Sequence, residues 1–298
     1  MRCEDCGLLY LNPRPTRSEM GRYYPAQYFG PPSPPRRFSR VKRWILQDFY
    51  GYPEIASPGY RRYLRKLLLW PEYIRRVITG RESLPWVGRG RLLDVGCGSG
   101  VSTAIYKEQG WNVSGLDLNE VAVRYARTLL GNRVQLGDLM SVRYPDRAFD
   151  LVRLSHSLEH MYGLGQVLAV VGRILDDGGV LAVTVPNAGS WEAKIFRRWW
   201  YPWELPRHLH HFERATIGDL LQRAGFRVIR MQTGVTAAHF MTSLERVWAH
   251  GLGRALPARR MVEKLLARPF CLLAGNLGYG TEITVYAVKL ATHEMGDN

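Results

Sequence analysis

Residues 92–100 read Leu-Leu-Asp-Val-Gly-Cys-Gly-Ser-Gly, a short apolar strand that runs directly into a glycine-rich turn. Glycine adopts positive φ angles at little steric cost, so three glycines let the backbone approach a ligand closely. A helix that follows such a turn directs its free backbone N–H groups at that ligand. A second apolar strand, residues 113–118, carries Asp117 near its end, where a carboxylate can accept hydrogen bonds from both hydroxyls of a ribose. Together the two segments predict an adenosine-containing cofactor at the carboxyl edge of a parallel sheet.

The spacing of the glycines distinguishes between adenosine cofactors. Dinucleotide-binding folds usually show Gly-x-Gly-x-x-Gly, whereas Gly96, Gly98 and Gly100 are each separated by one residue and are preceded by Asp94. A pyrophosphate requires several anion-binding N–H groups, while the sulfonium cation of S-adenosylmethionine (SAM) is compatible with a nearby acid. The pattern resembles motif I of the class I SAM-dependent methyltransferases, Asp/Glu-x-Gly-x-Gly-x-Gly. A glycine turn in another α/β fold is the alternative.

The resemblance extends beyond this motif. Residues 149–160 read FDLVRLSHSLEH and are similar to the family's fourth motif, and residues 175–181 read LDDGGVL and resemble the turn before its fifth strand. Residues 185–187, 206–212 and 224–226 resemble one branch of the family. That branch includes the ubiquinone-pathway O-methyltransferases and methyltransferases encoded with glycan-building enzymes. Cys3 and Cys6, with the residues up to Pro15, are similar to the second half of a four-cysteine zinc site of that branch. The first cysteine pair is absent here, and a structural zinc needs four ligands, so we assign no metal site.

The order of apolar segments predicts the fold class and the domains. Strands that alternate with helices indicate a parallel sheet covered on both faces. With the resemblance, we expect an α/β, Rossmann-like, doubly wound sheet of seven strands, mostly parallel with an antiparallel last strand, plus an N-terminal helical cap. The cap and a basic helical segment are expected at residues 1–89 and the methyltransferase domain at 90–291. Insertions are expected at about 188–212 and 236–280, the second of them helical.

Composition and charge restrict the class of protein. With 46% hydrophobic and 22% charged residues the chain is typical of globular proteins. No apolar run reaches the ~18 residues of a membrane span, and the N-terminus has no signal-peptide core, so we expect a cytoplasmic protein. Residues 31–90 carry 13 Lys and Arg against 4 Asp and Glu, a net of +9 out of +15 for the chain. This favours an anionic partner, and a solvated charged face is the alternative.

Two local patterns in this basic segment predict its structure. The prolines of residues 31–35 indicate a stiff linker. Helical spacing of apolar residues predicts a helix around residues 41–49, another at 61–69, and a third from Pro71 to about Thr79. The helices are separated at Pro71 because proline disrupts a helix interior.

The resemblance implies a cofactor site. SAM is the expected cofactor and S-adenosylhomocysteine (SAH) the product. Asp138 follows the third strand, where the family places an acid near the adenine amine, and Ser155 and His156 are expected to shape the methyl pocket. The residues assigned to the cofactor are Asp94, Gly96, Cys97, Gly98, Gly100, Asp117, Leu118, Asp138, Leu139, Ser155 and His156.

The histidines are the candidates for chemistry. Methyl transfer is an in-line displacement in which the enzyme mainly positions the reactants, and an oxygen nucleophile must also lose a proton to a base. Five of the eight histidines lie between residues 156 and 211. His208 is our first candidate for the general base and His211 the second, with a hydrogen-bonding brace as the alternative for either. Glu159 and His160 are interpreted as bracing a helix.

The acceptor is the least specified part of the prediction. Residues 191–203 hold four of the nine tryptophans, interleaved with arginine. Such a segment can stack on sugars or bases or lie at a lipid interface, or it can simply fold onto its own domain. With the basic segment it favours a small-molecule or glycan acceptor, including a phosphorylated or lipid-linked glycan, and peripheral contact with an anionic membrane at its inner face.

Two other functions stay open at this point. A nucleic-acid base methyltransferase is compatible with the charge, but nucleic acid is disfavoured because residues 154–156 read Leu-Ser-His rather than the Asn/Asp-Pro-Pro-Tyr of amino-group base methylases. A non-enzymatic SAM-binding protein is the other alternative. Salt-dependent retention of RNA would favour the first alternative, and methyl turnover on any acceptor would exclude the second. Binding of SAM without NAD would exclude a dehydrogenase.

Overall fold

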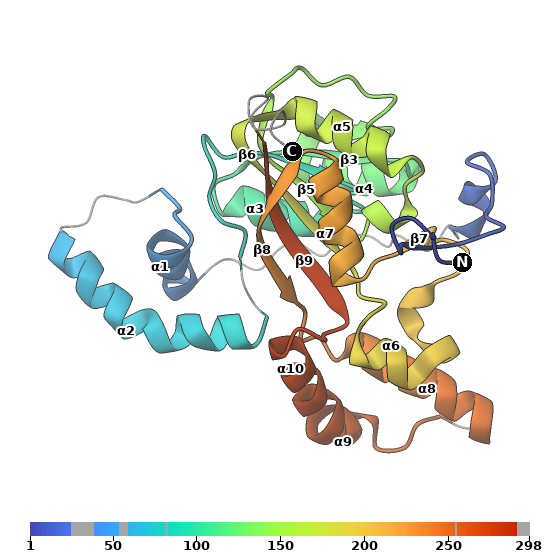
Figure 1. The fold of residues 1–298 in the computed structure, drawn as a ribbon. Helices are drawn as coiled ribbons and strands as arrows, with labels where there is room; N and C mark the ends of the chain where they lie inside the picture. The colour runs from blue at the N-terminus through green and yellow to red at the C-terminus, as the bar shows by residue number, and fades with distance from the viewer. Residues whose placement is uncertain (25–38, 54–58, 81–82, 254, 291–298) are drawn as a thin grey trace. The chain divides into compact units, whose positions relative to one another are not determined.

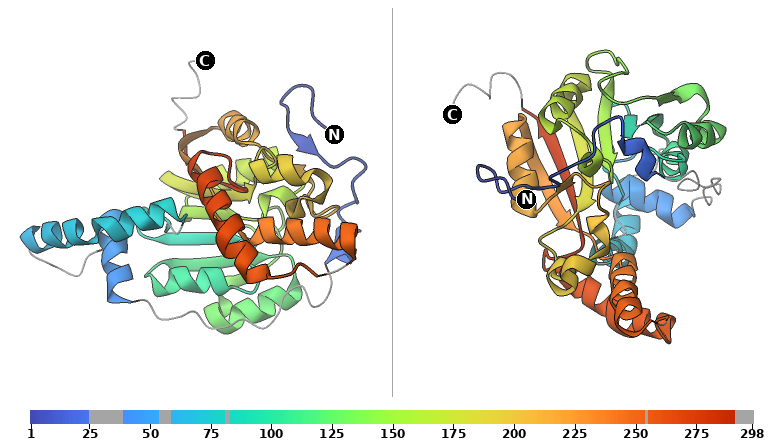
Figure 2. Two further views of the ribbon diagram at one scale, coloured as in Figure 1. Left: turned by 90° about the horizontal axis from the view of Figure 1, so that it is seen from below. Right: turned by 90° about the vertical axis from the view of Figure 1, so that its right-hand side faces the viewer.

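The computed structural model describes residues 1–24, 39–53, 59–80, 83–253 and 255–290 (Figures 1 and 2). The predicted linker at residues 31–35 lies outside the described residues. Two compact units are present. The glycine-turn unit comprises Phe29–Arg153 and Arg173–Val180, and the histidine unit comprises Met1–Tyr28, Leu154–Gly172 and Leu181–Asn298. The domain boundary at residues 89 and 90 stays a prediction.

Seven strands form the main sheet, in the order β4–β3–β2–β5–β6–β9–β8. They are β2 (Arg91–Val95), β3 (Asn112–Asp117), β4 (Val134–Leu136), β5 (Phe149–Ser155), β6 (Leu175–Pro186), β8 (Phe226–Thr233) and β9 (Glu282–Lys289). Strand β3 pairs in parallel with both β2 and β4, whereas β9 pairs with β8 in antiparallel orientation. The predicted seven-stranded, mostly parallel sheet with an antiparallel last strand is confirmed.

Short apolar strands and capped helices build the glycine-turn unit. Its helices are α1 (Arg40–Phe49), α2 (Gly59–Ile78), α3 (Val101–Glu108) and α4 (Glu120–Leu130), with a 3-10 turn, η2, at Gly131–Arg133. Strand β2 is buried from Leu92 onward, as its apolar sequence requires. The Asn119 side chain accepts a hydrogen bond from the Ala122 N–H and so caps α4. These elements place the glycine turn and Asp117 at the ends of neighbouring parallel strands.

Helix α2 corrects one prediction. It runs unbroken through Pro71, so the separation into two helices was wrong. An interior proline removes a hydrogen bond and costs about 3 kcal/mol, but contacts with α1 hold both sides of it. Before Pro71, the Arg65 guanidinium donates two hydrogen bonds to the buried Asp48 carboxylate, at 2.7 and 2.8 Å. After it, Tyr73 stacks on Phe49 with ring centroids 4.2 Å apart.

The histidine unit is helical between β8 and β9, the segment where a helical insertion was predicted. Its regular elements are β1 (Leu9–Tyr10), η1 (Met20–Tyr23), η3 (Leu158–His160), α6 (Trp191–Phe196), η4 (Arg197–Trp199), η5 (Tyr201–Trp203), β7 (His210–His211), α7 (Arg214–Arg223), α8 (Ala238–Leu252), α9 (Arg259–Val262), the π-helix η6 (Glu263–Ala267) and α10 (Arg268–Asn276), while α5 (Leu164–Ile174) extends from it into the other unit. Helix α7 lies alongside β8 (Figure 1).

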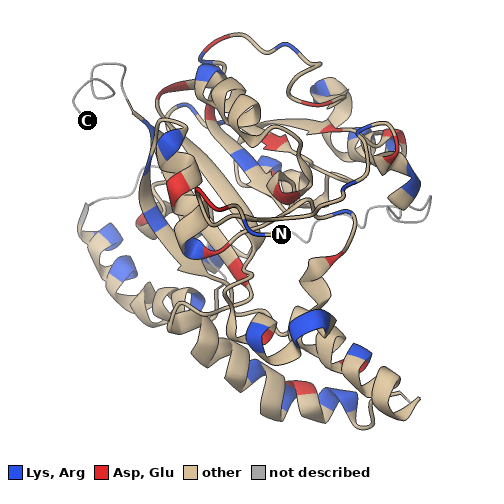
Figure 3. Cartoon of the chain, turned by 45° about the vertical axis from the view of Figure 1, so that its right-hand side comes forward, with Lys and Arg blue, Asp and Glu red and all other residues tan. Residues whose placement is uncertain are grey.

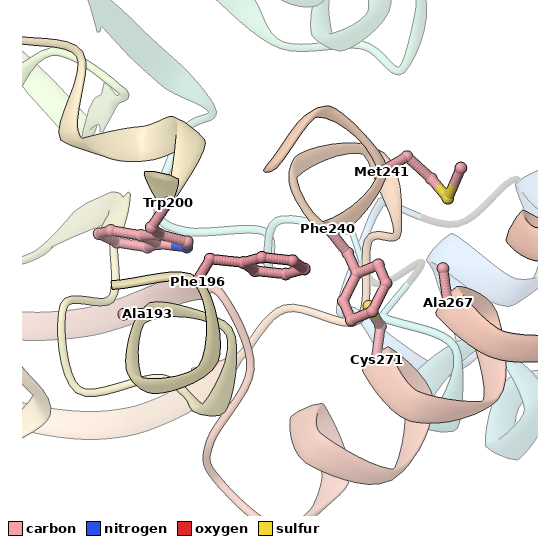
Figure 4. Close-up of a cluster of buried hydrophobic side chains, with 7 residues drawn as sticks. All are labelled: Ala193, Phe196, Trp200, Phe240, Met241, Ala267 and Cys271. Carbon is pink, nitrogen blue, oxygen red and sulfur yellow. The ribbon is translucent and has the colours of Figure 1, made fainter. Parts of the chain in front are cut away.

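The tryptophan-rich segment packs onto the helical insertion. Trp200 is fully buried, and Phe196 meets Phe240 edge to face with ring centroids 5.0 Å apart. Figure 4 shows this cluster, in which α6, α8 and α10 contribute side chains to one apolar core. Trp191 stacks on Tyr279, with centroids 5.2 Å apart. Most of the aromatic surface at residues 191–203 is therefore used for packing within its own unit.

The N-terminal segment lies along the residues that lead into α7. Strand β1 pairs with β7 in antiparallel register, and the Leu11 N–H donates to the Leu209 carbonyl at 2.9 Å. The Arg2 guanidinium donates to the Glu213 carboxylate at 2.7 Å. Within the described ranges, no helix has both the length and the apolar character to span a membrane.

Candidate active site

The glycine turn has a conformation that only glycine adopts readily. Gly96, Gly98 and Gly100 have φ angles of 75°, 55° and 79°. Gly100 is also the N-cap of α3, and a Cβ atom at this position would lie 2.9 Å from the Ala126 Cα of α4. The turn therefore combines a left-handed backbone with a close approach of two helices. Glycine-rich loops that bind adenosine cofactors require both features.

Asp117 is tied to the same turn. Its Oδ2 accepts the Gly98 N–H and its Oδ1 accepts the Asn119 N–H, both at 2.8 Å. Burial raises the pKa of the Asp117 carboxyl, and these hydrogen bonds oppose that effect. A carboxylate has about four acceptor positions, so two backbone bonds leave capacity for the hydroxyls of a ribose. The residues present fit the adenosine part of SAM.

Asp94, which precedes the glycine turn, has partners for its carboxylate within the same unit. Its buried carboxylate accepts the Thr103 hydroxyl at 2.5 Å and pairs with the Arg153 guanidinium at 2.8 and 3.0 Å. It therefore braces the start of α3 against β5. Sequence reasoning missed Arg153, although a charge inside the apolar stretch of residues 149–155 is a signal that a partner is needed.

The other predicted cofactor residues of this unit differ in exposure. Leu118 is 73% exposed, whereas Leu139 and Cys97 are buried, and burial raises the pKa of the Cys97 thiol. The Asp138 carboxylate accepts the backbone N–H groups of Met140 and Ser141 at 3.0 and 2.8 Å and so shapes its own turn. Their contacts with the cofactor stay predictions.

In the histidine unit, Ser155 is the last residue of β5 and His156 follows it with a positive φ of 52°. This conformation is strained for a residue with a Cβ, and such strain concentrates at functional sites. The His156 N–H donates to the Thr184 carbonyl at 2.8 Å. Its Nδ1 lies 3.6 Å from Glu159 and its Nε2 lies 3.6 Å from Glu282.

Glu159, four residues after the end of β5, has a buried carboxylate. The Glu159 side chain is fully buried, and neither of its oxygens accepts a hydrogen bond from any residue that the structure describes. Burial acts to raise the pKa of Glu159, but the neighbouring His156 and His160 outweigh it and hold the pKa below its usual value. An ionised, buried carboxylate with no hydrogen bond is costly, so this residue requires an explanation.

His208, the first base candidate, belongs to the same cluster. Its Nδ1 lies 2.8 Å from the Pro202 carbonyl and its Nε2 lies 3.6 Å from Glu204. Its ring meets the His160 ring at nearly right angles, with centroids 4.6 Å apart. Burial lowers the pKa of His208 to about 4. The structure thus joins His208 to residues 156–160, which sequence reasoning had treated separately.

His211, the second candidate, lies on β7 beside the cluster. The His211 ring meets the Trp203 ring edge to face, with centroids 4.8 Å apart. The centroids of the His211 and His208 rings are 6.3 Å apart. Burial lowers the pKa of His211 to about 3. The sequence analysis assigned no site role to Glu204 or His160. The Leu-Glu-His of residues 158–160 was the signal that could have placed His160 in the candidate site.

Cys3 and Cys6 are free, partly exposed thiols. No histidine, cysteine or acidic side chain of the described chain completes a set of three potential metal ligands with them. The zinc half-site therefore gains no support from its surroundings.

Comparison with known proteins identifies the family. Residues 60–231, more than half of the chain, match the family described as "Methyltransferase domain". The chain belongs to this family, and the sheet order and glycine turn are those of a class I SAM-dependent methyltransferase. SAM is accordingly its cofactor, as the first motif predicted.

Individual relatives match about half of this chain. A probable SAM-dependent methyltransferase of Mycolicibacterium smegmatis is 28% identical over 138 residues, 46% of this chain and 52% of that protein. The ubiquinone biosynthesis O-methyltransferase of Thiobacillus denitrificans is 29% identical over 164 residues, 51% of this chain and 70% of that protein. The chain spans about half the length of the first curated relatives it matches.

The fold has counterparts among solved structures. A chain in the complex between the Haloferax volcanii Trm112 methyltransferase activator and the putative methyltransferase is 18% identical, with a TM-score of 0.51. The match covers 77% of this chain and 94% of that one. At this level of identity the similarity concerns the fold alone.

Proposed function

We propose that this protein transfers a methyl group from SAM to an oxygen atom of a small-molecule or glycan-type acceptor. The observation that carries the proposal is the bond from the Gly98 N–H to Asp117, because it joins the glycine turn to the ribose-binding acid. The family match and a relative named as an O-methyltransferase support methyl transfer and favour oxygen.

The proposed roles of the cofactor residues follow from their positions. SAM supplies a methyl group that its sulfonium already activates. Asp117 would accept hydrogen bonds from the ribose hydroxyls, and Asp138 would lie near the adenine amine. In the glycine-turn unit, the backbone of Gly96, Gly98 and Gly100 would allow close approach, with Cys97, Leu118 and Leu139 beside it and Asp94 bracing the turn. In the histidine unit, Ser155 and His156 would shape the methyl pocket. Positioning of this kind can contribute on the order of 7–11 kcal/mol to lowering the barrier.

An oxygen acceptor also needs a base, and His208 stays the first candidate. The Pro202 carbonyl oxygen can only accept a hydrogen bond, so the proton of His208 is on Nδ1 and the lone pair is on Nε2. His211 is the second candidate because it lies in the same buried group of aromatic rings. Replacement of His208 by Asn is expected to lower kcat by 10²- to 10⁴-fold, which is roughly the contribution of a general base.

The first experiment uses binding before turnover. Isothermal calorimetry should detect SAH binding and no NAD binding. Turnover is then measured with SAM labelled in its methyl group, using catechols, polyprenyl-phosphate glycans and RNA as separate acceptors. Label in the catechol or glycan fraction supports the proposal, whereas label in RNA favours the nucleic-acid alternative. NAD binding without SAH binding would contradict the proposal entirely.

For the acceptor we propose contact with an anionic membrane, which fits a lipid-linked or phosphorylated glycan. Helix α2 exposes an apolar row at 50–79% of its side-chain surface, made of Tyr60, Tyr63, Leu64, Leu67, Leu68 and Trp70. Basic residues are interleaved with this row (Figure 3). Exposed apolar side chains flanked by Lys and Arg are typical of helices that lie in a lipid interface.

Vesicle flotation tests this second proposal. Binding to phosphatidylglycerol vesicles is expected at low salt and should weaken with salt, because surface charge is screened. The double variant Leu67→Ser and Leu68→Ser should bind less. Leu265→Ser and Leu266→Ser, which change two exposed leucines of the insertion, should bind like wild type. Absence of flotation at low salt would remove the membrane from the proposal.

A further inference from the structure

We propose that Glu159, His160 and His208 bind a divalent transition-metal cation in the histidine unit. One potential ligand atom from each of these residues lies within 4.8 Å of the other two. Metal–ligand bonds of about 2.0–2.2 Å place neighbouring ligand atoms about 3–4 Å apart. The three side chains therefore need to move by only about 1 Å to share a cation. This inference does not rest on the proposed function, because metal binding is measured without turnover.

The carboxylate of the cluster is the strongest evidence. Both oxygens of Glu159 are buried and without a hydrogen bond within the part of the chain that the structure describes. His156 lies beside it, with its Nδ1 3.6 Å from the Glu159 Oε1, beyond the distance of a hydrogen bond. A buried carboxylate is normally paired or coordinates a metal. A cation between the three residues would meet this requirement.

The imidazoles are prepared for ligation through the same nitrogen. The Nδ1 of His160 lies 3.0 Å from the Arg207 carbonyl, and the Nδ1 of His208 lies 2.8 Å from the Pro202 carbonyl. A carbonyl oxygen only accepts, so each Nδ1 carries the proton and each Nε2 keeps its lone pair. Metal-binding histidines are usually fixed in this way by a backbone carbonyl or carboxylate. Tyr24, whose hydroxyl is 3.2 Å from the His160 Nδ1, adds a second contact.

Two strained residues flank the cluster. His156 and Glu204 have φ angles of 52° and 37°, although neither is glycine. The Glu204 carboxylate accepts the Arg207 guanidinium at 3.0 Å and lies 3.6 Å from the His208 Nε2. Backbone strain of about 1–3 kcal/mol per residue persists where surrounding contacts determine the conformation, often at binding sites. Both side chains are close enough to join or brace the coordination.

The donor set indicates the class of metal. Imidazole nitrogen suits zinc, copper, iron and nickel, whereas magnesium, calcium and manganese prefer oxygen ligands. Three protein ligands leave at least one coordination position open, as in catalytic rather than structural sites. For His208, the ligand role and the base role exclude each other because both use Nε2. A bound cation would therefore transfer the base role to another residue.

Cobalt provides a direct test with the full chain after treatment with EDTA. Calorimetry and visible absorption are expected to show one Co²⁺ per chain. Binding should be at least tenfold weaker in Glu159→Gln and in His160→Asn. It should be unchanged in Glu245→Gln and His250→Asn, which alter the same residue types on α8, outside the cluster.

The N-terminal thiols are the competing explanation for any bound metal. The double variant Cys3→Ser and Cys6→Ser should keep its cobalt, and the wild-type spectrum should lack a thiolate charge-transfer band. Loss of cobalt from this variant, or full binding by Glu159→Gln, would overturn the proposal. No cobalt binding by the wild type would overturn it as well.

Thermal unfolding separates metal binding from a structural ion-pair network. Without metal, Glu159→Gln removes a buried charge that has no hydrogen bond, so its Tm is expected to equal or exceed that of the wild type. Excess Co²⁺ should raise the Tm of the wild type and leave that of the variant unchanged. A metal-free variant that melts lower, together with a wild type that gains nothing from Co²⁺, would identify Glu159 as an ion-pair partner and contradict the proposal.

Discussion

Replacement of Gly100 by Ala tests whether the glycine turn is determined by packing as well as by backbone conformation. Gly100 has a φ of 79°, and its added Cβ would lie 2.9 Å from both the Cα and the Cβ of Ala126. A left-handed residue with a Cβ costs roughly 1–2 kcal/mol. Overpacking against atoms that cannot move freely costs roughly 1–3 kcal/mol more. We therefore expect Gly100→Ala to lower the free energy of unfolding by about 3 kcal/mol.

Gly253→Ala is the matched control. Gly253 is left-handed like Gly100, with a φ of 60°, and no heavy atom of the described residues lies within 4 Å of its added Cβ. This variant carries the backbone cost alone, about 1–2 kcal/mol. Urea unfolding of both variants at one pH and temperature gives the steric contribution as the difference. Calorimetry with SAH then measures the effect on cofactor binding. If the turn moves to relieve the strain in Gly100→Ala, SAH affinity should fall about tenfold for each 1.4 kcal/mol needed to restore the binding conformation.

Equal destabilisation by Gly100→Ala and Gly253→Ala would show that α3 and α4 separate without cost. Unchanged SAH affinity in a destabilised Gly100→Ala would show that the turn does not hold the cofactor.

Three further perturbations follow from the glycine-turn unit. Asp117→Ala is expected to weaken SAH binding roughly 10- to 100-fold, the equivalent of one charge-assisted hydrogen bond; unchanged affinity by calorimetry would reduce Asp117 to a structural role. Asp150→Asn should lower the free energy of unfolding by about 3 kcal/mol at neutral pH, because the buried carboxylate accepts four hydrogen bonds from Arg89 and Arg91. Burial acts to raise the pKa of Asp150, but the Arg91 bonds outweigh it and the pKa lies below its usual value. The stabilisation by the Asp150 carboxylate is therefore complete above its unfolded pKa of about 3.9 and is lost as the pH falls through its lower folded pKa. In urea unfolding, the difference in unfolding free energy between wild type and Asp150→Asn should therefore narrow below about pH 4. A difference that stays constant with pH would contradict a stabilising role of the ionised carboxylate. Asn119→Ala should cost about 1 kcal/mol through loss of the α4 cap, and a change below a few tenths in the same assay would show that water replaces it.

Local patterns were sufficient for the framework because their causes are local. The turn of residues 96–100 was predicted from glycine alone, since its positive φ angles do not depend on distant contacts. The strand that leads into this turn was predicted from its apolar residues, and the structure places β2 there. The family, its cofactor and its sheet were therefore predictable from the amino-acid order.

Local reasoning failed where a distant contact compensates a local cost. Pro71 disrupts a helix by itself, but contacts of Arg65 and Tyr73 with α1 keep α2 continuous. The Asp94 carboxylate pairs with Arg153, 59 positions further along the chain, and the motif around Asp94 does not indicate this partner. Neither outcome can be derived from the residues next to it.

By itself, then, the amino-acid order determined that this chain forms a parallel sheet with a SAM-binding turn, because helix and strand preferences and glycine conformation act over a few residues. Only the tertiary structure decided what surrounds Glu159. It brings His160 and His208 together across 48 positions and buries the carboxylate without a hydrogen bond. Burial and the distance between remote side chains are properties of the packed chain, and these two properties are what indicate a metal site.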